Sequence, residues 1–329
     1  MKHGGDITQA IAQFGGPRAA WLDLSTGINP RAWPIPQDLL DVIWQRLPDR
    51  TDESALLDAA RRTYRVPDDV AVIAAPGTQA LIQWLPRLAA GGPVAILMPT
   101  YSEHALSWRA GGHDVITIET IENIPDQARH VVLVNPNNPD GRIVDRAALA
   151  RIAAVVAARG GWLVIDEAFV DAVPHKSAID LCAQYPVVIL RSFGKFYGLA
   201  GLRLGFALAA PAIAARIETA IGPWACSGPA LVIGAQALSD QAWADATRDW
   251  LEQQSEALDK ILQDAGSRQA GGTSLYRLVR HGDAQAIHAR LARQNIWCRS
   301  FEWDHSLLRF GLPPDRPSLN RLADALAHR

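Results

Sequence analysis

A chain of 329 residues is long enough to bury a large apolar core, so its stability requires neither disulfides nor a structural metal. Its formal net charge is −2, and charges of both signs are spread along the sequence. This pattern excludes a basic stripe for nucleic acid and a polybasic segment for a membrane surface.

The three cysteines, Cys182, Cys226 and Cys298, lie far apart and have no metal-ligand spacing. Their odd number favours a reducing compartment, and a single disulfide between two of them stays open as an alternative. The first residues lack the apolar core of a signal peptide, and two arginines and two glycines interrupt the most apolar long stretch, 147–165. We therefore expect a cytoplasmic protein without a metal site or a membrane span.

The first 34 residues are rich in glycine and proline and show little periodicity. This composition indicates an N-terminal arm. Helical patterns follow at 37–46 and 54–64.

A regular alternation of strands and helices begins at Val70. The expected strands are short apolar runs at 70–75, 94–98, 115–118, 131–134, 163–165, 187–190 and 204–208. Helical patterns lie between most of them, for example at 78–89, 103–110 and 146–158. This order is typical of an α/β fold with a mostly parallel sheet, here of seven strands, covered by helices on both faces. Ligands of such sheets bind at the carboxyl ends of the strands.

The pattern changes after Pro211. Helical patterns at 212–220 and 229–238 lead to a long one at 240–265, which is long enough to link two domains. Beyond it, strand-like segments at 275–279 and 296–300 alternate with helical patterns at 284–294 and 318–328. We expect an arm (1–34), a large domain (35–239) and a small α+β C-terminal domain (240–329) against which the arm can pack.

The stretch Arg191–Gly205 directly follows an expected buried strand and holds Lys195 among small and aromatic residues. A lysine kept from bulk water can act as an amine nucleophile and form a Schiff base. Ser192 lies three positions before the lysine and Arg203 eight positions after it, and both suit a phosphate held nearby. Taken alone, the stretch also fits a glycine-rich loop with a solvated lysine.

Two further candidate ligand contacts follow earlier strands. Gly77-Thr78-Gln79 opens an expected helix, whose free backbone N–H groups bind phosphate readily, although an ordinary turn has the same sequence. Tyr101, in Pro99-Thr100-Tyr101, can either stack on a planar heterocycle or pack at the edge of the domain.

Two polar motifs follow later strands. Asn135–Gly141 reads N-P-N-N-P-D-G and forms a turn. Asp166 directly follows the expected strand 163–165. A buried carboxylate at this point is costly unless it is paired or caps the following segment.

In this order, the motifs resemble the cofactor site of fold-type I pyridoxal-phosphate (PLP) enzymes, in the branch that holds histidinol-phosphate aminotransferases and threonine-phosphate decarboxylases. The resemblance implies that PLP is the cofactor and that Lys195 and Asp166 are catalytic, the aspartate keeping the ring an electron sink. The implied PLP contacts are Lys195 at the aldehyde carbon, Asp166 at the pyridine nitrogen, Asn138 at the phenolic oxygen, Tyr101 on the ring face, and Gly77, Thr78, Ser192 and Arg203 at the phosphate. It further implies a homodimer that acts on a small phosphorylated amino acid, without nucleic-acid or membrane partners.

The sequence departs from the family's pattern at two positions. Aminotransferases of this branch carry D-E-A-Y, whereas this chain has Phe169 in place of the tyrosine, as threonine-phosphate decarboxylases do. The family's R-Y-P-D motif, whose tyrosine reaches the PLP phosphate of the neighbouring subunit, is Arg46-Leu47-Pro48-Asp49 here. Leu47 cannot make that contact.

Candidate substrate contacts lie near both ends of the chain. Arg309 matches the family's substrate-binding arginine, and Arg299 matches a second arginine of the decarboxylases. The segments of His3 and Asn29 resemble the opening of threonine-phosphate decarboxylases. Two guanidinium groups suit a substrate with both a carboxylate and a phosphate, and each charge-assisted bond contributes about 1.5–3 kcal/mol.

The expected reaction is PLP-dependent decarboxylation of L-threonine O-3-phosphate to (R)-1-aminopropan-2-yl phosphate and CO2, which supplies the aminopropanol side arm of cobalamin. A histidinol-phosphate-type aminotransferase is the alternative, and a non-catalytic PLP-fold binding module is a remote one. A dinucleotide-binding oxidoreductase is disfavoured because the chain lacks G-x-G-x-x-G.

Overall fold

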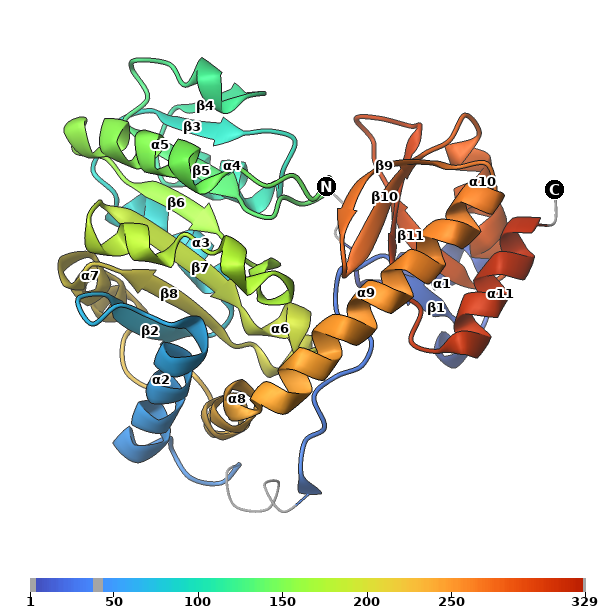
Figure 1. Ribbon diagram of the computed structural model, residues 1–329, viewed down its shortest axis with the longest axis horizontal. Coiled ribbons are helices and arrows are strands. Elements are labelled where there is room, and N and C mark those ends of the chain that lie inside the picture. The colour runs from blue at the N-terminus through green and yellow to red at the C-terminus, as the bar shows by residue number, and fades with distance from the viewer. Residues whose placement is uncertain (1–3, 38–43, 328–329) are drawn as a thin grey trace. The chain divides into compact units, whose positions relative to one another are not determined.

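A computed structural model describes residues 4–37 and 44–327 of the chain (Figure 1). Its contacts divide the chain into two compact units. Unit 1 consists of the described residues within Met1–Ala32, Pro139–Gly141 and Asp245–Arg329, and unit 2 of those within Trp33–Asn138 and Arg142–Ala244. The predicted domain boundaries at residues 34 and 239 stay predictions.

Unit 2 is built on a seven-stranded sheet among its described residues, in the order β2-β8-β7-β6-β5-β3-β4. The strands are β2 Ala71–Ala75, β3 Val94–Leu97, β4 Val115–Ile118, β5 His130–Val134, β6 Leu163–Asp166, β7 Val187–Ser192 and β8 Gly205–Ala209. Strand β8 is antiparallel to both of its neighbours, and the other pairs in the sheet are parallel.

Helices cover both faces of this sheet, and Figure 1 shows α5 in front of it and α3 behind it. The helices of unit 2 are α2 Arg50–Tyr64, α3 Thr78–Leu88, α4 Glu103–Ala110, α5 Arg146–Ala158, α6 Phe193–Phe196, α7 Pro211–Ile221 and α8 Gly228–Ser239. Short 3-10 turns are η3 Ile121–Asn123, η4 Val170–Ala172, η5 Pro174–Lys176, η6 Ile179–Ala183 and η7 Ala200–Leu202. Asp49 and Asp145 cap α2 and α5 because their carboxylates accept backbone N–H groups of the first turn.

The core of unit 2 forms where the apolar side chains of one sheet face meet α3, α4 and α7. Leu81 and Leu85 of α3, Trp108 of α4 and Ile217 of α7 pack there against buried strand residues such as Val164. The strands are buried on both faces, which explains their near-continuous apolar sequences.

Unit 1 is built on a five-stranded sheet in the order β1-β11-β12-β10-β9, again counted over the described residues. Its strands are β1 Leu22–Leu24, β9 Arg268–Thr273, β10 Tyr276–Arg280, β11 Ile296–Ser300 and β12 Leu307–Gly311. Its helices are α1 Thr8–Phe14, α10 Ala284–Arg293 and α11 Arg316–Ala327, with the 3-10 turn η1 Arg18–Ala20. Helix α9, Gln241–Asp264, begins in unit 2 and continues in unit 1.

The predicted fold class is confirmed: unit 2 is α/β with a mostly parallel sheet, and unit 1 mixes helices with a smaller sheet. The predicted arm contributes a strand to unit 1, because β1 pairs in parallel with β11. The helical pattern at 37–46 lies largely outside the described residues. Across 4–37 and 44–327, no helix combines the length and apolar character needed to cross a membrane.

Candidate active site

One edge of the seven-stranded sheet gathers the residues predicted to bind a cofactor. The parallel strands end there, and β8 begins there because it runs in the opposite direction. Gly77 and Thr78 follow β2, Tyr101 follows β3, Asn138 follows β5, Asp166 ends β6, Ser192 ends β7, Lys195 lies between β7 and β8, and Arg203 lies just before β8. The carboxyl edge is where ligands bind in sheets of this kind.

Lys195 lies on α6, a single helical turn held by aromatic packing. Phe193 and Tyr197 flank the lysine in sequence, and their rings stack with centroids 4.5 Å apart. Tyr197 also stacks on Trp243, with centroids 5.6 Å apart. The lysine Nζ lies 5.9 Å from the centre of the Phe169 ring. The turn therefore presents a partly buried amine from a rigid base.

The four residues predicted to contact the phosphate, Gly77, Thr78, Ser192 and Arg203, converge at the start of α3. Gly77 has a φ of 81°, and a Cβ built on it would lie 2.7 Å from Nη2 of Arg203. A Cβ on Gly205 would lie 2.6 Å from the backbone nitrogen of Thr78, and Gly205 is the register partner of Ser192. A helix N-terminus, a hydroxyl group and a guanidinium group thus share one small region, which is a suitable set of donors for a phosphate dianion.

Asp166 is buried, with 3% of its surface exposed, and both of its carboxylate oxygens have partners within unit 2. Oδ1 accepts the backbone N–H of Ala168 at 3.0 Å, and Oδ2 lies 2.9 Å from Nε2 of His104, which is itself buried. Because an ionised carboxylate only accepts hydrogen bonds, the imidazole donates to it. These bonds fix the direction in which the carboxylate points.

Tyr101 is held by a chain of side-chain hydrogen bonds. Its hydroxyl donates to Oε1 of Gln79 at 3.2 Å, and the Gln79 amide donates to Glu103 at 3.2 Å. Burial raises the pKa of Tyr101 to about 12, and the carboxylates of Glu103 and Asp166 add to the effect while Arg203 opposes it. Tyr101 is therefore a neutral phenol at physiological pH.

The loop that carries Asn138 is fastened to the loop that carries Tyr101. Asn137 accepts the hydroxyl of Thr100 at 2.7 Å and donates to the carbonyl of Pro99 at 2.9 Å. Arg142 donates to the carbonyl of Met98 at 3.0 Å. These bonds hold the loops of Asn138 and Tyr101 together at the sheet edge.

A buried ion cluster lies next in sequence to Asp166 and Ser192. Arg191 pairs with Glu167 at 3.3 Å and with Asp171, and its guanidinium lies 4.1 Å above the Tyr64 ring. Burial raises the pKa of Glu167, while Arg191 opposes that shift. Glu167 directly follows β6, and Arg191 lies in β7. Their ion pair therefore ties the ends of the two strands together.

Unit 1 contains the two arginines predicted to bind substrate. Arg299 on β11 and Arg309 on β12 are direct register partners, so two cations lie opposite each other on adjacent strands. Burial lowers the pKa of Arg309 to about 10, and Arg299 contributes to the shift, so Arg309 still carries its charge at neutral pH. The guanidinium of Arg309 donates to the Ser25 carbonyl at 2.7 Å and lies 5.2 Å from the centre of the Tyr276 ring. Like charges placed opposite each other are unfavourable unless an anion joins them.

The two predicted substrate contacts near the N-terminus have different outcomes. Asn29 is buried in unit 1, and its Oδ1 accepts the backbone N–H of Arg31 at 2.9 Å. It also lines a cavity of about 450 Å³ together with Thr26 and Gly311. His3 lies outside the described residues.

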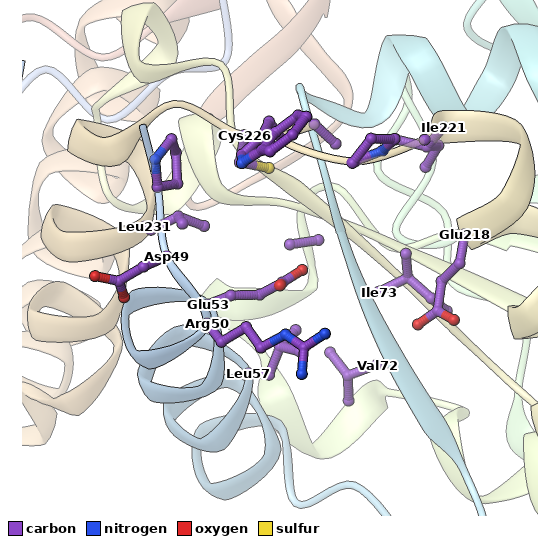
Figure 2. A pocket seen from close by; sticks show the side chains of 16 residues that line it. Asp49, Arg50, Glu53, Leu57, Val72, Ile73, Glu218, Ile221, Cys226 and Leu231 are labelled. Atoms are coloured by element: carbon purple, nitrogen blue, oxygen red, sulfur yellow. The ribbon is translucent and has the colours of Figure 1, made fainter. Parts of the chain in front are cut away.

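A further cavity of about 480 Å³ in unit 2 involves none of the predicted cofactor residues. Figure 2 shows Arg50 and Glu53 of α2 on one side of it, Glu218 and Ile221 of α7 on another, and Cys226 at its rim. Its lining includes Pro48 and the exposed Trp224.

The residues at the sheet edge fit PLP. A buried carboxylate suits a protonated pyridine nitrogen, and the donors around Gly77 suit the phosphate. The steric space at Gly77 is already taken by Arg203, so a side chain there would displace the guanidinium. An amine on a short, packed turn suits a covalent link to an aldehyde.

His104, Gln79 and Asn137 are the site residues that the sequence motifs did not reveal. His104 lies on α4, three positions after Tyr101 in sequence, and the two rings lie 6.2 Å apart, but no motif marked it as the partner of Asp166. Nothing in the sequence pointed to Gln79 or Asn137 as partners of Tyr101 and Thr100, because these contacts join segments 22 and 37 residues apart.

The fold and the lysine-bearing sheet edge place the protein in a known class. Residues 50–326 match the family model of class I and II aminotransferases. The chain belongs to this family, and the resemblance inferred from the motifs is confirmed.

Full-length relatives narrow the comparison. The chain is 44% identical over 327 residues to the threonine-phosphate decarboxylase of Sinorhizobium sp., covering 99% of this chain and 97% of the relative. It is 40% identical over 329 residues to the threonine-phosphate decarboxylase of Pseudomonas aeruginosa, with the same coverage. Among solved structures, the histidinol-phosphate aminotransferase of Sinorhizobium meliloti in complex with pyridoxal-5'-phosphate has a TM-score of 0.84 at 23% identity, covering 96% of this chain and 92% of that one.

Proposed function

We propose that this chain is a PLP-dependent decarboxylase that converts L-threonine O-3-phosphate to (R)-1-aminopropan-2-yl phosphate and CO2. The observation that carries the proposal is the cross-strand pair of Arg299 and Arg309, two cations suited to a substrate with two anionic groups. The names of the two full-length relatives support the same reaction. Within a biosynthetic route, the product would supply the aminopropanol side arm of cobalamin.

Unit 2 supplies the residues for the cofactor. Lys195 holds it covalently, Ser192, Arg203 and the start of α3 hold its phosphate, and Asn138 donates to its phenolic oxygen. Tyr101 packs on the ring, and Asp166 holds a proton at the ring nitrogen. When bound, PLP withdraws electrons from the α-carbon of an attached amino acid.

Unit 1 supplies the residues for the substrate's anionic groups. Arg309 binds one of them, with its guanidinium plane set by Ser25 and Tyr276. Arg299, Asn29 and His3 complete the proposed set. Their task is to hold the bond between the α-carbon and the carboxylate perpendicular to the ring plane, so that this bond breaks in preference to the C–H bond.

The proposed reaction is balanced without an oxidant or a second substrate. The bond from the α-carbon to the carboxylate breaks, and CO2 leaves without the bonding electron pair. Lys195, whose amine the substrate's amine has displaced, delivers a proton to the α-carbon, and the amine product is released when Lys195 takes its place again. Phe169, buried beside Lys195, keeps water from this region.

The alternative reaction is a transamination of the histidinol-phosphate type, which the shared fold also accommodates. The two reactions differ in their requirements, because a transaminase needs an oxo acid as acceptor and releases no CO2. The deciding experiment incubates the PLP-loaded protein with L-threonine O-3-phosphate in the absence of any oxo acid. We expect stoichiometric CO2 and aminopropyl phosphate, and their absence would refute the decarboxylase proposal.

We also propose a homodimer, formed through the exposed apolar surface of unit 2. Trp44, Leu47 and Trp224 are 65%, 68% and 64% exposed, and Trp224 shares the cavity of Figure 2 with Pro48. Leu47 directly precedes Pro48, and large exposed apolar side chains of this kind are typical of an interface. Light scattering after size exclusion is expected to give twice the chain mass, and Trp224→Arg is expected to give a monomer. The control is Trp303→Arg, which changes an exposed tryptophan of unit 1 and should leave the dimer intact.

A cytoplasmic location belongs to the same proposal. Cys182, Cys226 and Cys298 are free and buried, which supports a reducing compartment.

A further inference from the structure

Ser25 connects three parts of unit 1. Its hydroxyl accepts the backbone N–H of Gly5 at 2.8 Å and donates to the Asp23 carboxylate at 2.6 Å. Its own N–H donates to the same Asp23 oxygen at 2.9 Å, and its carbonyl accepts the guanidinium of Arg309 at 2.7 Å. One buried residue therefore contacts both the Gly4–Gly5 segment and the proposed substrate arginine.

The backbone at Gly4 lies so close to Ser25 that only glycine fits at this position. A Cβ built on Gly4 would fall inside the contact distance of the Ser25 carbonyl oxygen, the atom that accepts the hydrogen bond from Arg309. A side chain at position 4 would therefore displace either this segment or the carbonyl. This contact gives a physical reason for the glycine at position 4.

The contact with Ser25 constrains the guanidinium plane of Arg309. A guanidinium group is planar, and it binds a carboxylate through two parallel hydrogen bonds only when its plane is correctly oriented. The hydrogen bond to the Ser25 carbonyl and the Tyr276 ring, whose centre lies 5.2 Å from the guanidinium carbon, constrain that plane. Asp23 holds Ser25 in place by accepting two of its hydrogen bonds.

We propose that Ser25 is a positioning residue that sets the orientation of Arg309 and, through its hydroxyl, ties the Gly4–Gly5 segment to that arginine. The proposal rests on the proposed function in one respect, namely that Arg309 binds an anionic group of the substrate. The tie between Ser25 and Gly5 does not depend on that function.

The structure provides a matched control for this serine. Asp304 and Ser306 form the same local turn, in which the serine N–H and hydroxyl both donate to the aspartate, at 3.0 and 2.6 Å. Ser306 contacts Arg280 and His281 instead of Arg309. Ser306→Ala therefore removes the hydroxyl bond of the same kind of turn, keeps the backbone N–H bond, and does not reach the proposed substrate arginine.

The test compares Ser25→Ala with Ser306→Ala and wild type. In Ser25→Ala we expect the KM for L-threonine O-3-phosphate to rise about three- to tenfold, the effect of about one hydrogen bond, with a smaller change in kcat and unchanged PLP affinity. Hydrogen exchange of the Gly5 amide, measured on the protein without substrate, should become faster. Ser306→Ala should alter neither the KM nor the Gly5 exchange. Gly4→Ala should reproduce both effects, and it replaces Ser25→Ala if that variant does not fold.

Each outcome decides between the alternatives. A wild-type KM in both Ser25→Ala and Gly4→Ala would overturn the role of Ser25 in positioning Arg309. Unchanged Gly5 exchange in Ser25→Ala would overturn the tie to the Gly4–Gly5 segment. If wild type releases no CO2 from L-threonine O-3-phosphate, the proposed function fails, and the exchange measurement alone then judges the tie.

Discussion

The carboxylate of Asp166 illustrates how single side chains of unit 2 prepare the sheet edge for a cofactor. Its two oxygens accept hydrogen bonds from Ala168 and His104, so the group cannot rotate freely. A buried carboxylate without such bonds would be costly to keep ionised. His104 therefore supports the charge on which the proposed pairing with the pyridine nitrogen depends.

His104→Ala removes this support and is expected to lower kcat/KM about tenfold or more and to weaken PLP binding, since the loss of one bond to a charged group costs about 1.5–3 kcal/mol. His104→Gln is the control, because its amide can still donate to Asp166, and it should retain most of the PLP affinity. Titration of the apoprotein with PLP, followed by absorbance, measures both variants. Equal PLP affinity in wild type and His104→Ala would contradict this role for His104.

Phe169→Tyr restores the hydroxyl that aminotransferases of the branch carry at this position. The new hydroxyl can donate to the phenolic oxygen of PLP beside Lys195, and such a bond stabilises the deprotonated form of the lysine–cofactor linkage. We therefore expect the absorbance of the bound cofactor to titrate at lower pH in Phe169→Tyr than in wild type. A spectrophotometric pH titration measures the shift. Phe169→Leu adds no donor, so it should not lower the pH at which the absorbance changes.

Most of the candidate residues could be named from the sequence because each lies in a short motif. Lys195, Asp166 and Asn138 are of this kind, and the chemistry of each needs its residue type at the end of a strand. His104 could not be assigned from such a motif, because its partner is 62 residues away and becomes a neighbour only when the sheet forms. Ser25 was missed for the same reason, since it contacts Arg309 across 284 residues.

At the scale of elements, β11 and β12 bring two cations together. The register pairs Arg299 with Arg309, and like charges directly opposite each other reduce the stability of a sheet. An arrangement that lowers stability persists where function requires it. The pair is consistent with a site made to receive an anionic substrate.

Arg299→Gln tests this balance between stability and binding. Removing one cation should leave the free energy of unfolding unchanged or raise it by up to about 1 kcal/mol. The KM for L-threonine O-3-phosphate should rise about tenfold because a charge-assisted bond is lost. Thermal unfolding and steady-state kinetics measure the two effects. A clear loss of stability with an unchanged KM would instead assign Arg299 a structural role.

Elements with a clear apolar pattern were predicted well, and some strands that depend on pairing with distant segments were not. Helices α4 and α5 and strands β4 and β11 have the bounds expected from the sequence. The three-residue strand β1 was missed because it is too short to show a pattern and depends on pairing with β11. Strand β9 was also missed, since its Gly271-Gly272 pair reads as a break, whereas the glycines there lie within hydrogen-bonded pairing with β10.

At the scale of the whole molecule, residues that support the fold lie at the sheet edge opposite the candidate site. His130 begins β5, donates from Nε2 to the Ala90 carbonyl and accepts the Trp162 N–H at Nδ1. Burial lowers its pKa from 6.5 to about 4, and the neighbouring His113 and Arg129 add to the shift. The folded state therefore requires this imidazole to be neutral.

The lowered pKa predicts how stability depends on pH. The contribution of His130 is fully present above pH 6.5 and is lost as the pH falls toward 4, because the unfolded chain then binds a proton that the folded chain does not. The loss amounts to about 2 kcal/mol after allowance for solvent screening. Chemical denaturation between pH 7.5 and 4.5 should show a shallower decline in His130→Gln than in wild type. His175→Gln, which changes an exposed histidine, should keep the wild-type slope.

The reversed direction of β8 has a consequence for engineering. Because β8 starts at the edge where its neighbours end, the connection from β7 to β8 never leaves that edge, and the chain departs to the other side only at Ala209. Five residues at about 3.3 Å each separate the two edges by roughly 17 Å. Exposed loops at the far edge, such as Asp126-Gln127 before β5, are therefore expected to accept inserted peptides or labels that leave turnover intact. Insertions between residues 193 and 204 would abolish it.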